Sequence, residues 1–219
     1  MTHIIHCRNV YDRWSSTVDK LEEEKRRKLQ RNKGGNEDPT TATPSQEVKE
    51  QEEEDYYEEG NGGAGGIGSI GIQLAKYLRT YVATTVSTND KQFVQELGAD
   101  QIIDYKTENF EDMIHDCDAV FDTVGGDTYK RSFKVLKKGS GIIVSMLEQP
   151  NSELMNQYEV KAVFLFSQVN RERLTKLAEW VDQNNIKVNV DKTFSLDEAA
   201  KALDYQKDVH PRGKVVLTV

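Results

Sequence analysis

The residues best suited to chemistry are the glycines of a short run about one third of the way along the chain. Gly63, Gly65 and Gly68 fit the pattern G-x-G-x-x-G. A dinucleotide pyrophosphate binds at the N-terminus of a helix, where free N–H groups and the positive end of the helix dipole meet it. Because the backbone must approach the phosphates closely, side chains larger than hydrogen are excluded. The run therefore predicts a dinucleotide-binding turn; a glycine-rich linker before an ordinary helix is the alternative.

The elements that would position this turn alternate between helices and strands. Apolar residues at helical spacing follow the glycines directly, namely Ile67, Ile70, Leu74, Ala75 and Leu78. Beyond them we predict strands over 81–86, 101–104, 118–124, 141–146, 161–167, 186–190 and 214–219, and helices over 91–97, 109–115, 128–136, 171–183 and 196–205. In helix 171–183 we expect Leu174, Leu177, Ala178 and Val181 to face inward. Nearly continuous apolar strands indicate a parallel sheet covered on both faces, and hence a doubly wound α/β domain over residues 61–219.

Residues 1–60 differ from the rest of the chain. Only 14 of these 60 residues are apolar, too few to enclose a core. Charged pairs at i,i+4 spacing predict a helix over about 15–31, followed by a linker over 32–45 and an acidic run over 46–59. The basic cluster at 25–28 is better explained as one side of a charge-paired helix than as a nuclear signal. We therefore expect a charged N-terminal arm, partly helical and partly disordered.

Composition excludes several classes of protein. The formal net charge is −8, which argues against nucleic-acid or membrane partners. Cys7 and Cys117 are the two cysteines and form no pattern, so we expect neither a disulfide framework nor a metal site, and we expect a reducing, cytoplasmic setting. The start of the chain is too short and too polar for a signal peptide. The four histidines show no metal-binding spacing.

Several motifs then occur in a familiar order. They are GAGGIG at 63–68, QLAK at 73–76, ELGAD at 96–100 with IDY at 103–105, FDTVGG at 121–126 and RGKVV at 212–216. Together they make residues 61–219 resemble the cofactor-binding half of the medium-chain dehydrogenase/reductase superfamily, in its zinc-independent quinone oxidoreductase and enoyl reductase branch. The resemblance implies a Rossmann fold, NADPH as cofactor, and hydride transfer to a small quinone or enone substrate.

Two departures from that family affect the prediction. The family places a GroES-like catalytic domain before the glycine turn, and residues 1–60 are too short and too polar to form one. The strand that should precede the turn is replaced by the acidic run, and unpaired carboxylates are costly to bury in a central strand. We therefore expect the first central strand to be absent or poorly formed, in a truncated, rearranged or mis-spliced family member. An ordered strand at 52–59 would contradict this.

The end of the second predicted strand bears on the choice of cofactor. NAD-preferring proteins carry an acid there, and this chain has Ser87 followed by Lys91, which suit a 2′-phosphate. The resemblance implies that Ser87, Lys91 and Tyr105 line that phosphate. Asp90 is the counter-evidence because it could reject a phosphate, and Lys91 could simply be an exposed residue in the first turn of a helix.

The resemblance also implies roles for later segments. Val124, Gly125 and Gly126 would lie beside the nicotinamide ribose, Phe166 near the nicotinamide, and Arg212 in a segment that closes over the cofactor. The alternatives are a plain strand-to-helix turn, a core aromatic and an ordinary loop. The full set of expected cofactor-binding residues is Gly63, Gly65, Gly66, Ile67, Gly68, Ser87, Lys91, Tyr105, Val124, Gly125, Gly126, Phe166 and Arg212. No catalytic residue can be assigned, although Tyr129, Tyr158 and Tyr205 could donate a proton.

The last two predicted strands suggest an interaction surface. In the family the matching segments pair largely with the catalytic domain, so here their edges would be exposed. Exposed edges invite pairing with another chain, and we expect a homodimer or a partner chain at this place.

Two other functions remain open. One is a catalytically silent nucleotide-binding or interaction module. The other, a Rossmann-type methyltransferase, is disfavoured by the complete glycine motif and by Ser87 with Lys91.

Overall fold

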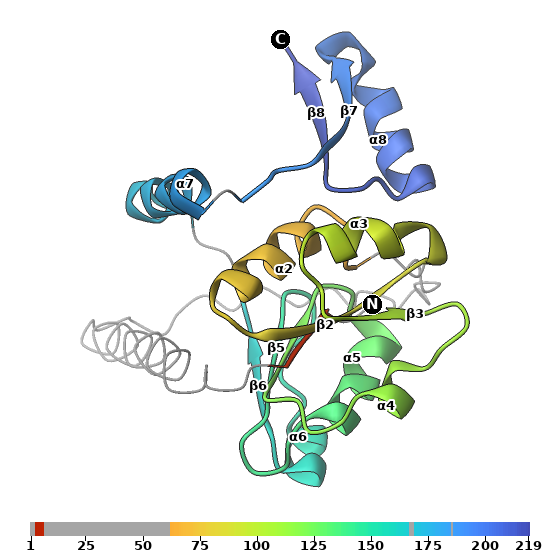
Figure 1. Ribbon diagram of the computed structural model, residues 1–219, viewed down its shortest axis with the longest axis vertical. Coiled ribbons are helices and arrows are strands. Elements are labelled where there is room, and N and C mark those ends of the chain that lie inside the picture. Colours follow the sequence, from red (N-terminus) through yellow and green to blue (C-terminus); the bar gives the residue numbers. More distant parts are fainter. Residues whose placement is uncertain (1–2, 7–61, 167–168, 185) are drawn as a thin grey trace, which may run out of the picture. The chain divides into compact units, whose positions relative to one another are not determined.

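The computed structural model describes residues 3–6, 62–166, 169–184 and 186–219, all within one compact unit of the chain (Figure 1). The predicted helix at 15–31, the linker, the acidic run and the question of a strand at 52–59 lie outside the described residues. The strands are β1 (His3–His6), β2 (Tyr81–Val86), β3 (Gln101–Asp104), β4 (Ala119–Asp122), β5 (Ile142–Ser145), β6 (Lys161–Phe164), β7 (Val190–Ser195) and β8 (Lys214–Thr218). The helices are α2 (Gly68–Tyr77), α3 (Lys91–Glu96), α4 (Phe110–Met113), α5 (Gly126–Ser132), α6 (Ser152–Tyr158), α7 (Arg171–Asn184) and α8 (Ala199–Val209).

Six of the strands form one sheet in the order β3-β2-β1-β4-β5-β6. This is the order of a classic dinucleotide-binding sheet. The pairs β2 with β3, β4 with β5, and β5 with β6 are parallel. The predicted Rossmann-like, doubly wound α/β fold is therefore confirmed, and the carboxyl ends of β2 to β6 meet at one edge of the sheet.

The central position of the sheet is filled by β1, which comes from the N-terminal end of the chain. Its residues pair in antiparallel fashion with β2, where Ile4 lies opposite Ala83, and with β4, where Ile4 lies opposite Val120. In a classic sheet the strand in this position runs parallel to its neighbours and leads directly into the glycine turn. Here 55 residues, 7–61, separate it from Gly62, the first described residue of that turn. The central slot is thus occupied, in reversed direction, by a segment that the sequence assigned to the arm.

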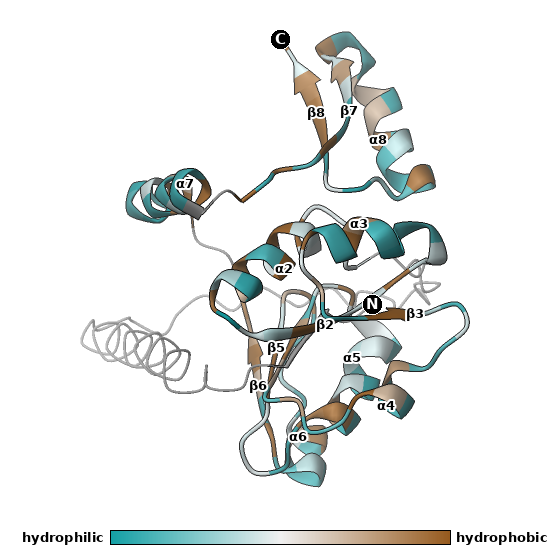
Figure 2. Ribbon diagram, viewed as in Figure 1, coloured by the Kyte–Doolittle hydropathy of each residue, from teal (hydrophilic) through white to brown (hydrophobic). Residues whose placement is uncertain are grey.

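Helices cover the two faces of the sheet and enclose separate cores (Figures 1 and 2). Val82 and Val86 of β2 pack with Ile72 and Ala75 of α2 and with α3. Ala83 of β2 faces the other way, into the larger core beneath α4, α5 and α6. This larger core also holds Ile103, Phe110, Val120, Phe133 and Ile143. The side chains of β2 alternate between the two cores, as expected for a strand buried on both sides. No helix among the described residues is long and apolar enough to cross a membrane.

Two predicted helix faces differ from the structure. In α2 the buried apolar residues are Ile72 and Ala75, while Ile67 is 44% exposed. The small residues Gly68 and Ser69 are also buried on that face and allow the helix to approach the sheet closely. In α7 the inward prediction was wrong, because Leu174 and Leu177 are 53% and 45% exposed. The described residues provide no surface that covers this stripe.

The predicted strand at 186–190 was also misplaced. The strand is β7, which begins at Val190 and forms a separate two-stranded parallel sheet with β8. The preceding segment is bound at Lys187 by a side chain, and at Asn189 its carbonyl accepts from the N–H of Lys214 of β8 at 2.9 Å. Gln73 of α2 donates to the carbonyl of Lys187 at 2.9 Å and accepts from its N–H at 2.8 Å. These two bonds replace a strand ladder, and nothing in the local sequence around Lys187 could reveal them.

Candidate functional site

The glycine turn lies at the carboxyl end of β2. Residues 62–67 form successive turns, and the N–H of Gly63 donates to the carbonyl of Thr85 at 3.3 Å. A Cβ atom added at Gly63 would stand 2.5 Å from Oγ1 of Thr84 and 2.7 Å from Cγ1 of Val86. Glycine is therefore required here so that the turn can pack closely against β2.

A second close approach joins the turn to the RGK segment near the end of the chain. Gly65 and Gly213 form a parallel bridge, and the N–H of Gly213 donates to the carbonyl of Ala64 at 2.8 Å. A Cβ atom at Gly66 would lie 2.9 Å from the carbonyl oxygen of Gly213. Gly65 and Gly213, which are 148 residues apart in the sequence, thus bring their two motifs into direct contact.

The N-terminus of α2 has the features of an anion site. No side chain caps this ten-residue helix, and its first turn carries no acid. Among the described residues, no acceptor meets the N–H groups of Ile67 and Gly68. Free donors and the positive end of a helix dipole therefore lie behind the glycine turn, as a pyrophosphate requires. The backbone of this chain fits the phosphates of a dinucleotide.

Beyond the end of β2, a network forms around Asp90. The hydroxyl of Ser87 donates to Oδ2 of Asp90 at 2.6 Å, and Nε of Arg212 donates to Oδ1 at 2.6 Å. Nη2 of Arg212 also donates to the carbonyl of Asn89 at 2.6 Å. Ser87, Asp90 and Arg212, two of which the sequence assigned to cofactor binding, are therefore one hydrogen-bonded group.

A second pair of opposite charges lies next to this network, at the end of β3. Nζ of Lys91 lies 3.5 Å from Oδ2 of Asp104, and the hydroxyl of Thr88 donates to the same oxygen. The bond from Thr88 is the largest of the effects that hold the pKa of Asp104 below its ordinary value, and Lys91 adds to it. Tyr105, which follows Asp104, donates its backbone N–H to the carbonyl of Val86 at 3.2 Å. The residues expected at a 2′-phosphate thus lie together at the ends of β2 and β3.

The turn after β4 forms the other end of the site. Oδ1 of the buried Asp122 accepts from the N–H groups of Val124 and Gly125 at 3.1 and 3.0 Å. Its Oδ2 accepts from the hydroxyl of Ser145 at 2.7 Å. Gly125 and Gly126 have φ values of 78° and 58°, a conformation that favours glycine. The buried carboxylate therefore fixes the shape of this turn and ties β4 to β5.

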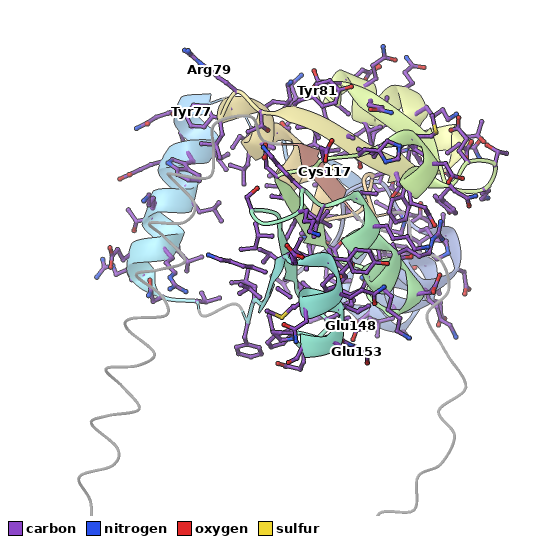
Figure 3. All side chains as sticks on the ribbon, turned by 90° about the horizontal axis from the view of Figure 1, so that it is seen from below. Tyr77, Arg79, Tyr81, Cys117, Glu148 and Glu153 are labelled. Atoms are coloured by element: carbon purple, nitrogen blue, oxygen red, sulfur yellow. The ribbon has the colours of Figure 1, made fainter. Side chains whose placement is uncertain are left out.

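Glu148 closes the same turn from the β5 side. Its Oε1 accepts from the N–H of Gly126 at 2.8 Å, and its own N–H donates to Oγ of Ser145 at 2.9 Å. Figure 3 labels Glu148 and, on α6, Glu153. The sequence did not indicate that Asp122, Ser145 and Glu148 hold this turn. The signal that could have found Asp122 is an acid in the last position of an apolar strand.

Phe166, which was predicted to lie near the nicotinamide, does not pack into either core. It follows β6 and is 75% exposed, so it belongs to neither core. The tyrosines are bound elsewhere: Tyr205 donates to Asp191 at 2.7 Å, and the buried Tyr129 lies 3.3 Å from the carbonyl of Gln149. Burial raises the pKa of Tyr129, and the bond to Asp191 raises that of Tyr205. Both phenols therefore remain protonated at neutral pH. The backbone N–H of Tyr129 donates to the carbonyl of Gly125, in the turn after β4, at 3.2 Å.

The carboxyl edge of the sheet, with its glycine turn and uncapped helix, can now be compared with known proteins. The family model described as zinc-binding dehydrogenase matches residues 97–217. The chain belongs to this family. It corresponds to the cofactor-binding half of a medium-chain dehydrogenase/reductase of the quinone oxidoreductase type, as the motifs predicted. In the described part of this zinc-binding dehydrogenase chain, no group of three or more His, Cys, Asp or Glu residues could hold a metal ion.

Relatives with assigned activities match the same part of the chain. A 2-methylene-furan-3-one reductase of Solanum lycopersicum is 35% identical over 160 residues, which cover 71% of this chain and 38% of that protein. An NADPH-dependent alkenal/one oxidoreductase of Arabidopsis thaliana, a chloroplastic protein, is 34% identical over 159 residues, with the same coverage. The chain therefore spans less than half the length of these relatives.

Solved structures share the fold. The quinone oxidoreductase from Coxiella burnetii superposes with a TM-score of 0.66 at 37% identity, over 72% of this chain and 50% of that one. The Escherichia coli quinone oxidoreductase complexed with NADPH gives a TM-score of 0.65 at 27% identity, over 72% and 55%. Each similarity covers the domain that contains the glycine turn.

Proposed function

We propose that this chain is the nucleotide-binding part of an NADPH-dependent oxidoreductase that transfers a hydride to a quinone or an activated C=C bond. The observation that carries the proposal is the uncapped N-terminus of α2 behind the glycine turn at the carboxyl edge of the sheet. That arrangement offers backbone donors to a pyrophosphate. Relatives named as NADPH-dependent alkenal/one and quinone oxidoreductases support the choice of reaction.

The preference for NADPH is supported by the residues at the ends of β2 and β3. Ser87 stands where an NAD-binding acid is expected, and two cations, Lys91 and Arg212, lie in the same neighbourhood. Asp90 faces Arg212, which compensates its charge. The acid that argued against a 2′-phosphate is therefore neutralised by a guanidinium.

The turn after β4 would hold the other end of the cofactor. A nicotinamide cofactor bound at this edge would supply the hydride. Within this chain, Asp122 and Ser145 hold the Val124–Gly126 turn rigid. Phe166 would add an apolar surface next to it. The chain's own share of the work is binding and orientation.

The last part of the proposal concerns the surface over the nicotinamide, the metal requirement, the compartment and the substrate. Because the chain spans only part of its relatives, we propose that the surface over the nicotinamide is supplied by sequence outside this chain or by another polypeptide. We propose that the reaction needs no zinc and takes place in the cytoplasm, with a small quinone or enone as substrate.

A second function, a catalytically silent nucleotide-binding or interaction module, is favoured by one observation. The central strand β1 is antiparallel and does not lead into the glycine turn. A turn that is not anchored by its own strand could bind a nucleotide without holding it in the geometry that hydride transfer demands.

Turnover assays separate the two functions. The purified chain is incubated with NADPH and a panel of quinones and α,β-unsaturated ketones, and oxidation of NADPH is followed at its nicotinamide absorbance. Substrate-dependent oxidation, reduced at least tenfold by a double substitution of Ser87 and Lys91 to Ala, would support the oxidoreductase. NADPH binding without any oxidation, both by the chain alone and after fusion to the catalytic half of a quinone oxidoreductase relative, would favour the silent module.

A further inference from the structure

Asp90 is a buried acid whose position the proposed function leaves unexplained. Its residue surface is only 6% exposed, and both carboxylate oxygens accept hydrogen bonds. One oxygen accepts from Ser87, which is three residues away. The other accepts from Arg212, which is 122 residues away along the chain. Burying a carboxylate is costly unless it is paired, so the pair with Arg212 is what permits this position.

The guanidinium of Arg212 is held by one of its two edges. Nε donates to Asp90 and Nη2 donates to the carbonyl of Asn89, so the Nε edge faces the loop after β2. Nη1 has no partner among the described residues, and the side chain is 44% exposed. An arginine fork can bind a phosphate through the terminal edge while its other edge stays bound to protein.

The ion pair of Lys91 with Asp104 is arranged in the same way as the ion pair of Arg212 with Asp90. Lys91 lies 3.5 Å from Asp104, whose carboxylate is fixed by Thr88 and is 2% exposed, while the Lys91 side chain is 42% exposed. Each buried acid therefore holds one partly exposed cation at the end of β2 or β3. A flexible lysine or arginine loses less freedom on binding a ligand when a buried partner already orders it.

We propose that Asp90 is a positioning residue for a 2′-phosphate, which it serves by holding Arg212 with the terminal edge of its guanidinium free, and that it does not reject the phosphate. This inference rests on the proposed function, since it assumes that the site takes a dinucleotide. Arg212 and Lys91 are then the two cations that distinguish a 2′-phosphate from a 2′-hydroxyl, and Asp90 acts through Arg212.

Simple electrostatics predicts the opposite effect of Asp90→Asn on NADPH binding, so this substitution distinguishes the two explanations. Removing a negative charge near a phosphate should strengthen NADPH binding, as long as Arg212 keeps its place. If Asp90 orders Arg212, then Asp90→Asn weakens NADPH binding instead, because the freed guanidinium loses the geometry that the bond provided. NADH binding should hardly change, because NADH shares the pyrophosphate and adenine contacts but lacks the 2′-phosphate.

The experiment is a double-mutant cycle on the full chain, with dissociation constants for NADPH and NADH from nicotinamide fluorescence. Asp90→Asn, Arg212→Gln and the double variant are compared with the wild type. Each single variant should lower the preference for NADPH over NADH about tenfold, the usual scale for a hydrogen bond to a charged group. In the Arg212→Gln background, Asp90→Asn should have no further effect. Glu159→Gln, which removes the acid of an exposed pair with Lys138, is the matched control and should change neither constant.

The outcomes separate the two proposals. A wild type that binds neither dinucleotide overturns the proposed function and this inference with it. A wild type that prefers NADPH, with the preference unchanged or raised in Asp90→Asn, overturns only the role of Asp90. Asp90→Glu tests for a merely structural effect: it should restore part of the NADPH preference, and failure to do so at an unchanged melting temperature and NADH affinity would contradict positioning.

Discussion

Gly63 and Gly71 lie eight residues apart in one glycine-rich stretch, and the structure uses them differently. At Gly63 the turn approaches β2 so closely that a Cβ atom would overlap Thr84 and Val86. At Gly71, inside α2, the nearest atom to an added Cβ would be Cδ1 of Phe121 at 4.0 Å, which is ordinary van der Waals contact. The first glycine is required by packing, and the second only leaves the helix more flexible.

Alanine at these two positions should therefore act in opposite directions. Gly63→Ala should lower the free energy of unfolding by about 1–3 kcal/mol, because the added methyl group overpacks the turn. Gly71→Ala should raise it by about 0.5–1 kcal/mol, because alanine is the better helix former. Urea denaturation of both variants measures the difference. Equal effects of the two substitutions would contradict the close packing of the turn against β2.

At the residue scale, the sequence predicted where these residues lie along the sheet better than it predicted their hydrogen-bond partners. Ser87 and Lys91 follow β2, and Gly125 and Gly126 follow β4, at the carboxyl edge of the sheet, as the predicted strands placed them. Asp90 was interpreted as an obstacle to the phosphate because its partner Arg212 is 122 residues away. A long-range ion pair leaves no local pattern that a sequence could show.

At the scale of elements, α4 and α5 are joined by a two-bond ion pair. Nε and Nη2 of Arg131 donate to the two carboxylate oxygens of Glu111 at 2.7 and 2.5 Å, and the guanidinium lies over the ring of Phe110. The bond from Arg131 is the main reason that the pKa of Glu111 is lowered from its ordinary 4.5. With its side chain 16% exposed, Glu111 is shielded enough for the pair to contribute to stability.

This pair predicts a specific pH dependence. Because the pKa of Glu111 is lower in the folded state, its stabilisation is fully present above about pH 4.5 and is lost as the pH falls through the folded pKa. Glu111→Gln should thus lower the free energy of unfolding by about 1–2 kcal/mol at pH 7. The gap to the wild type should narrow as the pH falls below about 4.5. Urea denaturation at several pH values measures it, and a gap independent of pH would contradict the assignment.

An exposed pair provides the matched comparison. Lys201 lowers the pKa of Glu198 as well, but the Glu198 side chain is 42% exposed and the pair is screened by solvent. Glu198→Gln should leave the free energy of unfolding unchanged within error at every pH measured.

The elements themselves were largely predictable, and the exceptions share a cause. Strands β2 to β6 are short apolar runs bounded by turns, and the predicted ranges match them to within a few residues. No prediction was made for β1 and α6. Among the predictions that were made, the failures were the buried face of α7 and the position of β7. In both, the outcome depends on contacts with distant parts of the chain, such as Gln73 with Lys187. Local periodicity carries no information on such contacts.

At the scale of the whole molecule, the most unusual feature is β1. A four-residue strand completes the sheet between β2 and β4, and the hydrogen bonds on both its sides depend on its backbone. Ile4→Pro removes a donor from the middle of this sheet and should destabilise the protein by about 3 kcal/mol or more. Ile4→Val keeps the donor and should cost less than about 1.5 kcal/mol.

Thermal unfolding followed by circular dichroism measures both variants. If Ile4→Pro melted at the temperature of the wild type, β1 would not be needed to complete the sheet, and the account of the central slot would be wrong.

The two-stranded sheet of β7 and β8 predicts self-association. Its edges have no further strand partner in the described part of the chain, and Leu217 on β8 is 42% exposed. We expect the average mass of the protein in light scattering to rise with concentration, and Leu217→Lys to reduce that rise, because a charge on an edge strand opposes pairing. A constant monomer mass for the wild type over a hundredfold range of concentration would refute the prediction.

The central claim is that the glycine turn, the uncapped N-terminus of α2 and the cations at the ends of β2 and β3 form one site for NADPH. The most direct test is a fluorescence titration of the wild-type chain with NADPH and, separately, with NADH. The account predicts micromolar binding of NADPH and binding of NADH that is at least tenfold weaker. Equal binding of the two would contradict the 2′-phosphate site, and no binding of either would show that a glycine turn without its own parallel strand cannot hold a dinucleotide.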